Sequence, residues 1–592
     1  MTTNDLNDKL QTTAILWNLD DLYKSIDDRA VANDCDWCTK ESQELVTTYK
    51  NTIAGLAAEE LQALAERLER LQSRLGKLAT FAFLNYTTQV DNTPAGAFYQ
   101  HIRELISEVE GRLIFFELEW NDLDQQRAQQ LLEDDVLDHY RHYLRSLRRY
   151  RPHLLSEAEE KILIERKVVG RSSWITLFEK VFGNLRFGEK GRTEEEVLSD
   201  LYNANREVRQ KAAAEMTEGL ESQNHILTHI YNTLAAEKMI SDRQRSYSSW
   251  VNSMNLDNQV EDATVDALIA AVTGRYDIVQ RYYGVKKRLL GLDTLYDYDR
   301  YAPLPALPAQ EFSWSECREI VLSSFAGFSP EMADIGKRFF EDGYIHAPVI
   351  QGKRGGAFAH PCIPEIHPYV MVNYTGSLRD ISTVAHELGH GIHMVLAADK
   401  GYFYSDTPLV LAETASVFAE LVVFRSQLQL LEDENARKAF TCQKLESIFA
   451  TVFRQTSMNR FEEAMHQGRR QQGELGSDAL SEYWLASQRK MFGDSVTLTD
   501  DYGLWWSYIP HFLATPGYVY SYAFGELLVL ALYRLYQEEG DAFIDKYFSL
   551  LAAGGSDTPY ALLTPLGIDL NDENFWNQGL ELIDSMLREV ED

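Results

Sequence analysis

Residues 382–393 read STVAHELGHGIH, and this stretch decides how the surrounding chain must fold. His386 and His390 are four residues apart, and a helix brings such residues to one face, one turn apart. Their imidazole nitrogens can then converge on a single cation. Glu387 stands beside the first histidine, where its carboxylate can take the proton of a water molecule on that cation. Apolar residues are available to pack the rest of this helix: Ile381, Val384, Ala385, Leu388 and Ile392.

A catalytic zinc site needs a third protein ligand and an open position for water. The stretch LVLAETASVFAELVVF (409–424) predicts a second apolar helix, and the loop before it is long enough for the chain to turn back antiparallel. We therefore predict Glu413 as the carboxylate ligand. Glu420 lies two turns further on the same face, and we predict that it orients a ligand histidine. Two imidazoles and one carboxylate favour a single Zn²⁺ per chain.

Three other patterns in the sequence are not predicted to bind a ligand directly. His393 lies a turn too far along to join the other two histidines, so we expect it to support or pack the site. Cys35 and Cys38 form one C-x-x-C pair without a second half for a zinc knuckle, and five cysteines in this length do not describe a disulfide framework. GNLRFGEK (183–190) resembles a phosphate loop but has Glu189 where the lysine must stand.

Composition limits the remaining possibilities. A chain of 592 residues is too long for one core. Its net charge of -33 repels phosphate backbones and anionic lipid, so we expect neither nucleic-acid nor membrane binding. The N-terminus lacks a basic region followed by an apolar stretch, and we expect a cytoplasmic location.

Helical periodicity dominates the chain, which predicts a mainly α protein. The pattern begins at AAEELQALAERLERLQ from Ala57 and recurs over 97–120, 124–149, 155–168, 194–240 and 260–290. The clearest strand is PYVMVNY (368–374), either an edge that pairs with a substrate backbone or an ordinary core strand. APLPALPAQ (302–310) reads as an extended connector, and glycines and charges over 183–196 separate two helical blocks.

HELGHGIH followed by LAETASVFAE resembles the oligoendopeptidase F and thimet oligopeptidase family of zinc metallopeptidases. Further resembling blocks follow the family's order and span most of the chain: WNLDDLY (17–23), NTLAAEKMISDRQRSY (232–247), GGAFAHPCIPEIHPYVMVNYTGSLRD (355–380) and HFLATPGYVYSYAFGE (511–526). The resemblance implies a zincin-type metallopeptidase whose helical body is divided by a deep substrate channel. We expect residues 1–190 to form an N-terminal helical region in the channel wall and 191–592 to form the catalytic domain.

Site roles follow from the same resemblance. His386, His390 and Glu413 match the family's zinc ligands, and Glu387 matches its general base. Tyr522 would then stabilise the developing oxyanion, a contribution of about 10²–10³-fold in rate for a well-placed donor.

The resemblance also gives His511 a role, contact with the substrate carbonyl. The thimet branch has a glycine-rich loop with a further tyrosine after this histidine. Thr515, Pro516 and Gly517 stand here instead, so either Tyr518 or Tyr520 would replace that tyrosine in binding substrate. The resemblance implies an endopeptidase for short, unfolded oligopeptides. A zinc aminopeptidase or carboxypeptidase on the same scaffold, and a non-catalytic peptide-binding protein, are the alternatives. The common aminopeptidase spacing would place the ligand glutamate at 409, where this chain has Leu409.

Overall fold

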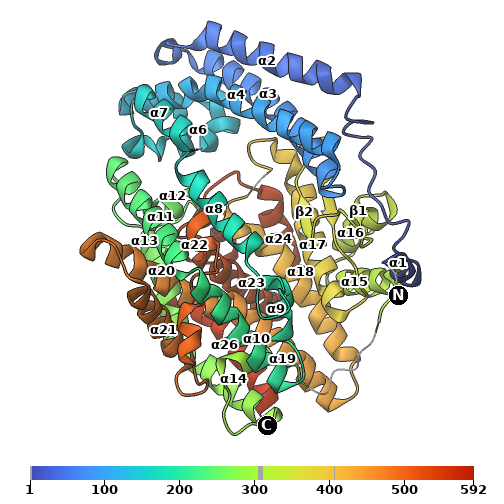
Figure 1. Cartoon of the computed structure of the whole chain (residues 1–592). Helices are drawn as coiled ribbons and strands as arrows, with labels where there is room; N and C mark the ends of the chain where they lie inside the picture. Colours follow the sequence, from blue (N-terminus) through green and yellow to red (C-terminus); the bar gives the residue numbers. More distant parts are fainter. Residues whose placement is uncertain (1–2, 168, 305–310, 406, 592) are drawn as a thin grey trace. The chain divides into compact units, whose positions relative to one another are not determined.

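A computed structural model describes residues 3–167, 169–304, 311–405 and 407–591, so most of the connector predicted at 302–310 lies outside the described residues. The described chain is mainly helical, as predicted (Figure 1). It divides into two compact units, each assembled from three stretches of chain. The first unit comprises Met1–Leu154, Ala309–Leu430 and Leu535–Ile568; the second comprises Leu155–Pro308, Leu431–Arg534 and Asp569–Asp592. The predicted division at residue 190 lies within the second unit, and the roles assigned to its two sides stay predictions.

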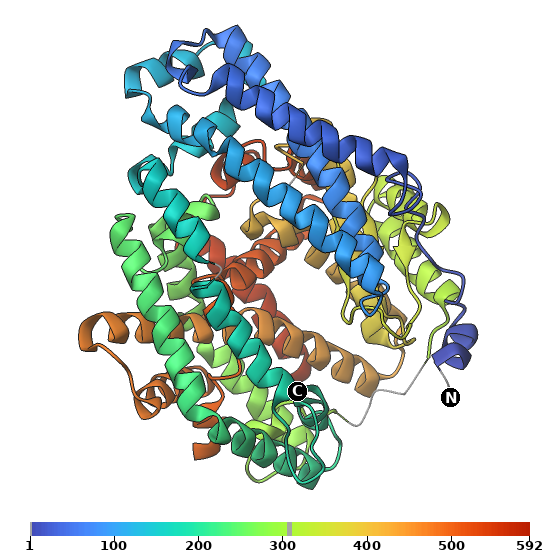
Figure 2. The ribbon, with the colours of Figure 1, turned by 45° about the horizontal axis from the view of Figure 1, so that its top comes forward.

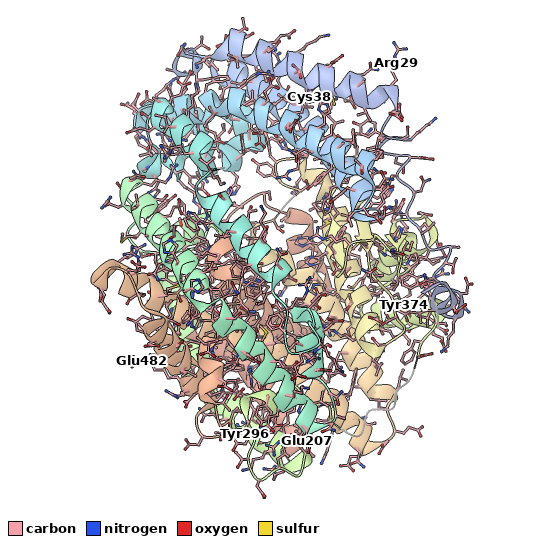
Figure 3. The ribbon with its side chains drawn as sticks, viewed as in Figure 1. Arg29, Cys38, Glu207, Tyr296, Tyr374 and Glu482 are labelled. Carbon is pink, nitrogen blue, oxygen red and sulfur yellow. The ribbon has the colours of Figure 1, made fainter. Side chains whose placement is uncertain are left out.

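The N-terminal part of the first unit is a set of long helices that pack side by side (Figure 2). The leucines that repeat from residue 61 onward are buried along one face of α3, as their spacing predicts. Trp120 of α4 is fully buried, and its indole N–H donates to the carbonyl of Leu144. Cys38, labelled in Figure 3, lies in this core as a free thiol, and burial raises its pKa to about 12. The helices are α1 (Thr3–Leu10), α2 (Arg29–Tyr49), α3 (Ala58–Thr87), α4 (Thr93–Asp122), α5 (Gln125–Leu132) and α6 (Arg141–Arg148).

The rest of the first unit surrounds one helix, α17, which contacts α15, α16, α18, α24 and two strands. The remaining elements are α15 (Trp314–Phe328), α16 (Pro330–Glu341), β1 (Ile345–His346), β2 (Phe358–His360), β3 (Tyr369–Met371), α17 (Leu378–Ala397), α18 (Leu409–Leu430), α24 (Asp541–Ala553) and α25 (Pro559–Leu563). The strands form a three-stranded sheet in the order β1-β3-β2.

The strand predicted over 368–374 is central rather than at an edge. It forms β3, which pairs parallel with β1 and antiparallel with β2. All three of its residues are buried, so the edge interpretation was wrong and the core interpretation was right. Just after the strand, the hydroxyl of Tyr374 (Figure 3) donates to the carbonyl of Phe312. The two edge positions belong to β1 and β2.

The second unit is helical and rich in buried aromatic side chains, among them Trp484, Trp506 and Tyr231. The helical block predicted over 194–240 is broken twice, because Asn205 caps a new helix and a turn at Gln223 starts another. The helices are α7 (Glu157–Lys167), α8 (Arg171–Asn184), α9 (Glu194–Asp200), α10 (Arg206–Ser222), α11 (Asn224–Gln244), α12 (Asn252–Asp257), α13 (Asp262–Gly274), α14 (Tyr276–Leu289), α19 (Glu434–Thr451), α20 (Phe453–Gln472), α21 (Ser477–Phe492), α22 (His511–Ala514), α23 (Tyr520–Glu539) and α26 (Glu573–Glu591).

Short 3₁₀ turns occur in both units. They are η1 (Ile53–Gly55), η2 (Asp135–Tyr140), η3 (Arg151–His153), η4 (Asp297–Asp299), η5 (Ala398–Lys400), η6 (Asp500–Leu504) and η7 (Thr564–Leu566). None of the helices in the described part of the chain combines the length and apolar character that a membrane span requires.

Candidate metal centre and tyrosine cluster

The helix that carries the motif begins at a strong capping signal. Ser377 accepts a hydrogen bond from the backbone N–H of Asp380, and the Asp380 carboxylate accepts one from the backbone N–H of Ser377. This reciprocal pair fixes the start of α17. The helix then runs without interruption through both motif histidines.

Glycine at position 389 allows α18 to lie against α17. A Cβ atom there would lie 2.5 Å from the carbonyl oxygen of Ala415 and 2.6 Å from the Cα of Ser416, distances that no ordinary contact reaches. The two helix backbones can therefore touch only because this residue has no side chain. The contact places the first turns of α18 opposite the motif, where Glu413 lies.

The three predicted ligands converge. Oε2 of Glu413 lies 3.4 Å from Nε2 of His386 and 3.5 Å from Nε2 of His390. A tetrahedral ion with ligand distances of about 2.0–2.1 Å separates its ligand atoms by about 3.3–3.4 Å. Both measured separations match this value closely. In the part of the chain that the structure describes, these residues form the one group of His, Cys, Asp or Glu side chains able to hold a metal ion.

Glu420 lies on the far side of His386. Its Oε2 is 3.5 Å from Nδ1 of His386, so the carboxylate can hold a proton on that nitrogen and leave Nε2 free for a cation. Burial alone would lower the pKa of His386, but the hydrogen bond to Glu420 and the charges of Glu413, Glu387 and Glu420 raise it to about 9. Burial lowers the pKa of His390 to about 4.

Glu387 is largely buried, with 7% of its surface exposed. Burial, helped by the charge of nearby Glu413 and opposed by His386 and the backbone N–H of Ala359, raises the pKa of its carboxyl group to about 7. Ala359 belongs to the edge strand β2, which lies against α17. His393 is buried on α17, and burial lowers its pKa to about 4.

Two supporting residues had no clear signal in the sequence. The hydroxyl of Ser416 donates to Oε2 of Glu413 over 2.7 Å and restrains that carboxylate. The i,i+3 spacing of Glu413 and Ser416 is the only hint that the sequence offered. Tyr547 of α24, fully buried, donates its hydroxyl to the carbonyl of Thr414 and fixes the same turn of α18.

The predicted tyrosine segment lies in the second unit. His511 begins α22, and its ring centroid is 6.5 Å from that of Tyr518 and 6.1 Å from that of Tyr522. The two tyrosine rings meet edge to face with centroids 4.9 Å apart. All three side chains are half-buried. Burial and the nearby Arg454 guanidinium lower the pKa of His511, which favours the neutral imidazole.

Tyr520 points elsewhere. None of its surface is exposed, and its hydroxyl accepts a hydrogen bond from Asn258 over 2.8 Å. The structure thus brings His511, Tyr518 and Tyr522 together in a group that we call the tyrosine cluster, whereas Tyr520 is buried and bonded to Asn258.

The helical fold and the two-histidine, two-glutamate arrangement define a metallopeptidase of the H-E-x-x-H type. The model of peptidase family M3 matches residues 199–582, and the Oligopeptidase F model matches residues 119–187. The chain belongs to peptidase family M3, and is a metalloendopeptidase.

Relatives and solved structures agree with this membership. The chain is 28% identical to oligopeptidase PepF of Bacillus subtilis, over 100% of this chain and 89% of that protein. It is 24% identical to an oligoendopeptidase F homolog of Borreliella burgdorferi, over 99% and 98% of the two chains. Its fold is similar to a solved structure from Chlamydophila abortus, with a TM-score of 0.85, 24% identity and 98% of each chain covered. It is also similar to oligoendopeptidase-F of Enterococcus faecium, with a TM-score of 0.73, 22% identity and coverage of 95% and 98%.

Proposed function

We propose that this metallopeptidase is a zinc-dependent endopeptidase that hydrolyses internal bonds of short, unstructured oligopeptides. The observation that carries the proposal is the position of one Glu413 oxygen, 3.4 and 3.5 Å from the Nε2 atoms of two histidines. The spacing suits a small tetrahedral cation, and the donor set of two imidazoles and one carboxylate suits zinc better than magnesium or calcium. Relatives with the names oligopeptidase and oligoendopeptidase support the substrate class.

His386, His390 and Glu413 would hold the ion, which supplies Lewis acidity for a water molecule and a substrate carbonyl. Glu420 keeps His386 in the tautomer that leaves Nε2 for the metal. Glu387, next to His386 on the same helix, takes a proton from the attacking water and returns it to the leaving amine. In this proposal the Glu387 carboxylate carries out both proton transfers.

The tyrosine cluster supplies the groups that bind the reacting carbonyl. We assign Tyr522 as the hydrogen-bond donor to the developing oxyanion and His511 as a contact to the substrate carbonyl. Tyr518, half-buried beside both rings, is assigned as the substrate contact. Tyr520 is the weaker candidate because its ring is fully buried and its hydroxyl is bonded to Asn258.

Glu387→Gln tests the catalytic assignment. The substitution keeps the size of the side chain but removes the base, so we expect full zinc content with turnover of a quenched-fluorescent oligopeptide reduced by at least about 10³-fold. Substantial residual turnover in a zinc-loaded variant would remove Glu387 from this role.

Peptides with blocked ends separate the alternatives. An endopeptidase cuts a peptide that is acetylated and amidated, whereas an aminopeptidase or a carboxypeptidase needs a free end. Mass spectrometry of a defined peptide mixture, with and without chelator, reports the cut position and the metal requirement together. Zinc-loaded protein that cuts no member of the mixture would favour a peptide-binding protein.

A further inference from the structure

The turn between α22 and α23 carries Tyr518 and leads directly into Tyr522. Its central residue, Gly517, has φ +84, in the left-handed region that favours glycine. A Cβ atom there would lie 3.2 Å from a methyl group of Val251 and 3.3 Å from the Cβ of Met254. The turn is therefore packed closely against the segment that starts α12, and its shape depends on what holds its backbone.

A buried carboxyl group holds that backbone. The N–H of Gly517 donates to Oε1 of Glu462, on α20, over 2.7 Å. Glu462 has no exposed surface. Burial raises its pKa to about 8, so the group is largely protonated at neutral pH and accepts the bond through its carbonyl oxygen. Among the described residues, Oε2 has no hydrogen-bond partner.

The surroundings of Glu462 are also polar and enclosed. His466 lies one turn further on α20, with Nε2 3.7 Å from Oε1 of Glu462. Neither ring nitrogen has a hydrogen-bond partner within the described ranges, and the ring stacks on Trp250 with centroids 5.1 Å apart. Each buried polar group without a partner destabilises the folded state. A core kept for stability alone would favour apolar side chains here.

Hydrogen bonds also anchor the chain on both sides of the turn. Arg171 of α8 donates to the carbonyl of Leu513 over 2.5 Å and is itself fixed by Glu237 over 3.0 Å. Asn258 holds the start of α23 through Tyr520 and Ser521. Between these two anchors, the described residues give the backbone N–H of Gly517 one side-chain partner, Glu462.

We propose that Glu462 is a positioning residue for the tyrosine cluster: its hydrogen bond to Gly517 sets the turn and so the placement of Tyr518 and Tyr522 beside His511. The proposal rests on the function proposed for that cluster. Glu462 acts only through the backbone of the turn, since its own side chain is enclosed between α20 and the turn.

Three variants test the hydrogen bond. Glu462→Gln keeps an oxygen acceptor at the same place. Glu462→Met keeps the length and removes the acceptor, and Glu462→Asp keeps the acid but shortens its reach. Glu463→Met is the matched control, because Glu463 is the next residue on α20 and, among the described residues, pairs with Arg460 over 2.7 Å and with Gln467 rather than with the turn. Amide hydrogen exchange of residues 515–519 and the steady-state constants for an oligopeptide are measured in each.

We expect the Gln and control variants to stay within about threefold of the parent. We expect the Met and Asp variants to lose about 10–100-fold in kcat with KM changed less than about threefold, since misplacement of reacting groups by 1 Å can cost 10²-fold. In the same two variants the amides of 515–519 should exchange at least about tenfold faster, while those of α17 stay unchanged.

Equal behaviour of the Gln, Met and Asp variants would overturn the proposal, and so would a loss of kcat without faster exchange in the turn. Failure of both Met and Asp variants to fold, with Gln folding normally, would make Glu462 a structural residue and also overturn it. The exchange measurement needs no activity. If the parent protein cuts no peptide, the proposed function fails, but amide exchange still tests whether the hydrogen bond from Gly517 to Glu462 holds the turn.

Discussion

The closeness of α17 and α18 makes a quantitative prediction for Gly389→Ala. The added methyl group would lie 2.5 Å from the carbonyl oxygen of Ala415, and its three nearest atoms all belong to the backbone of α18. Such a pair of atoms must be at least 3.0 Å apart and is in ordinary contact from 3.4 Å, so the helices must separate by roughly 0.5–0.9 Å. Glu413 moves with α18, whereas both histidines stay on α17.

Metal sites tolerate deviations of about 0.2 Å in ligand distance, so this separation disrupts the set of ligands. We expect the zinc affinity of Gly389→Ala to fall at least about tenfold, which corresponds to about 1.4 kcal/mol. Overpacking costs about 1–3 kcal/mol, and the better helix propensity of alanine returns about 1 kcal/mol. The fold should therefore survive while the site is damaged.

Zinc affinity is measured by competition with a chromogenic chelator, and peptide turnover is measured at saturating zinc. Gly111→Ala is the control, because Gly111 lies inside α4 with no atom near its missing Cβ. That variant should keep the parent's zinc affinity and gain stability. Unchanged zinc affinity in Gly389→Ala would refute the claim that the helix contact sets the ligand geometry.

Three further outcomes follow. Tyr522→Phe should lower kcat by about 10²–10³-fold with a smaller change in KM, as steady-state kinetics will measure; an effect on KM alone would make Tyr522 a binding contact. Glu420→Gln should weaken zinc binding by about 10–100-fold in the same chelator assay, because His386 loses the carboxylate that orients it; unaltered affinity would exclude that role. Burial and three nearby cations lower the pKa of His466 to about 3, so the folded state holds it neutral. The stability that His466 contributes is present above its unfolded pKa of about 6.5 and is lost as pH falls toward 3, so the urea midpoint of the parent should fall more steeply with pH than that of His466→Gln over this range. Parallel pH profiles would contradict this.

In the first unit, hydrophobic periodicity and residue spacing were sufficient to predict several helices. The leucine pattern from Ala57 predicted α3, and the paired apolar stretches around His386 and Glu413 predicted α17 and α18. These predictions succeeded because each depends on residues within one or two helices. Ligand spacing along a helix is a property of local geometry, and the antiparallel return to Glu413 needed only a loop of sufficient length.

Features that depend on residues far apart in the sequence could not be predicted fully. The strand at 368–374 was correctly located, but its place in the sheet depends on β1 and β2, and two strands of two and three residues leave little pattern in a sequence. The sequence could not distinguish Tyr518 from Tyr520, since the local pattern does not show which tyrosine hydroxyl Asn258 will bond. That choice is made by a residue more than 250 positions away.

Gly389 and Gly517 both allow close packing of the backbone, but only the role of Gly389 could be predicted from the sequence. Gly389 lies within the H-E-x-x-H motif, so a close helix contact at that point could have been anticipated from the need to bring a third ligand near. Gly517 lies in a turn whose partner, Glu462, is 55 residues earlier on another helix, and an acidic residue in an amphipathic helix is expected to face solvent. Glu462 instead faces the core and accepts a hydrogen bond from the turn that carries Tyr518. Because a backbone N–H can be satisfied by water as well as by a side chain, only the comparison of Gln with Met at position 462 shows whether the protein uses that bond to place its tyrosines.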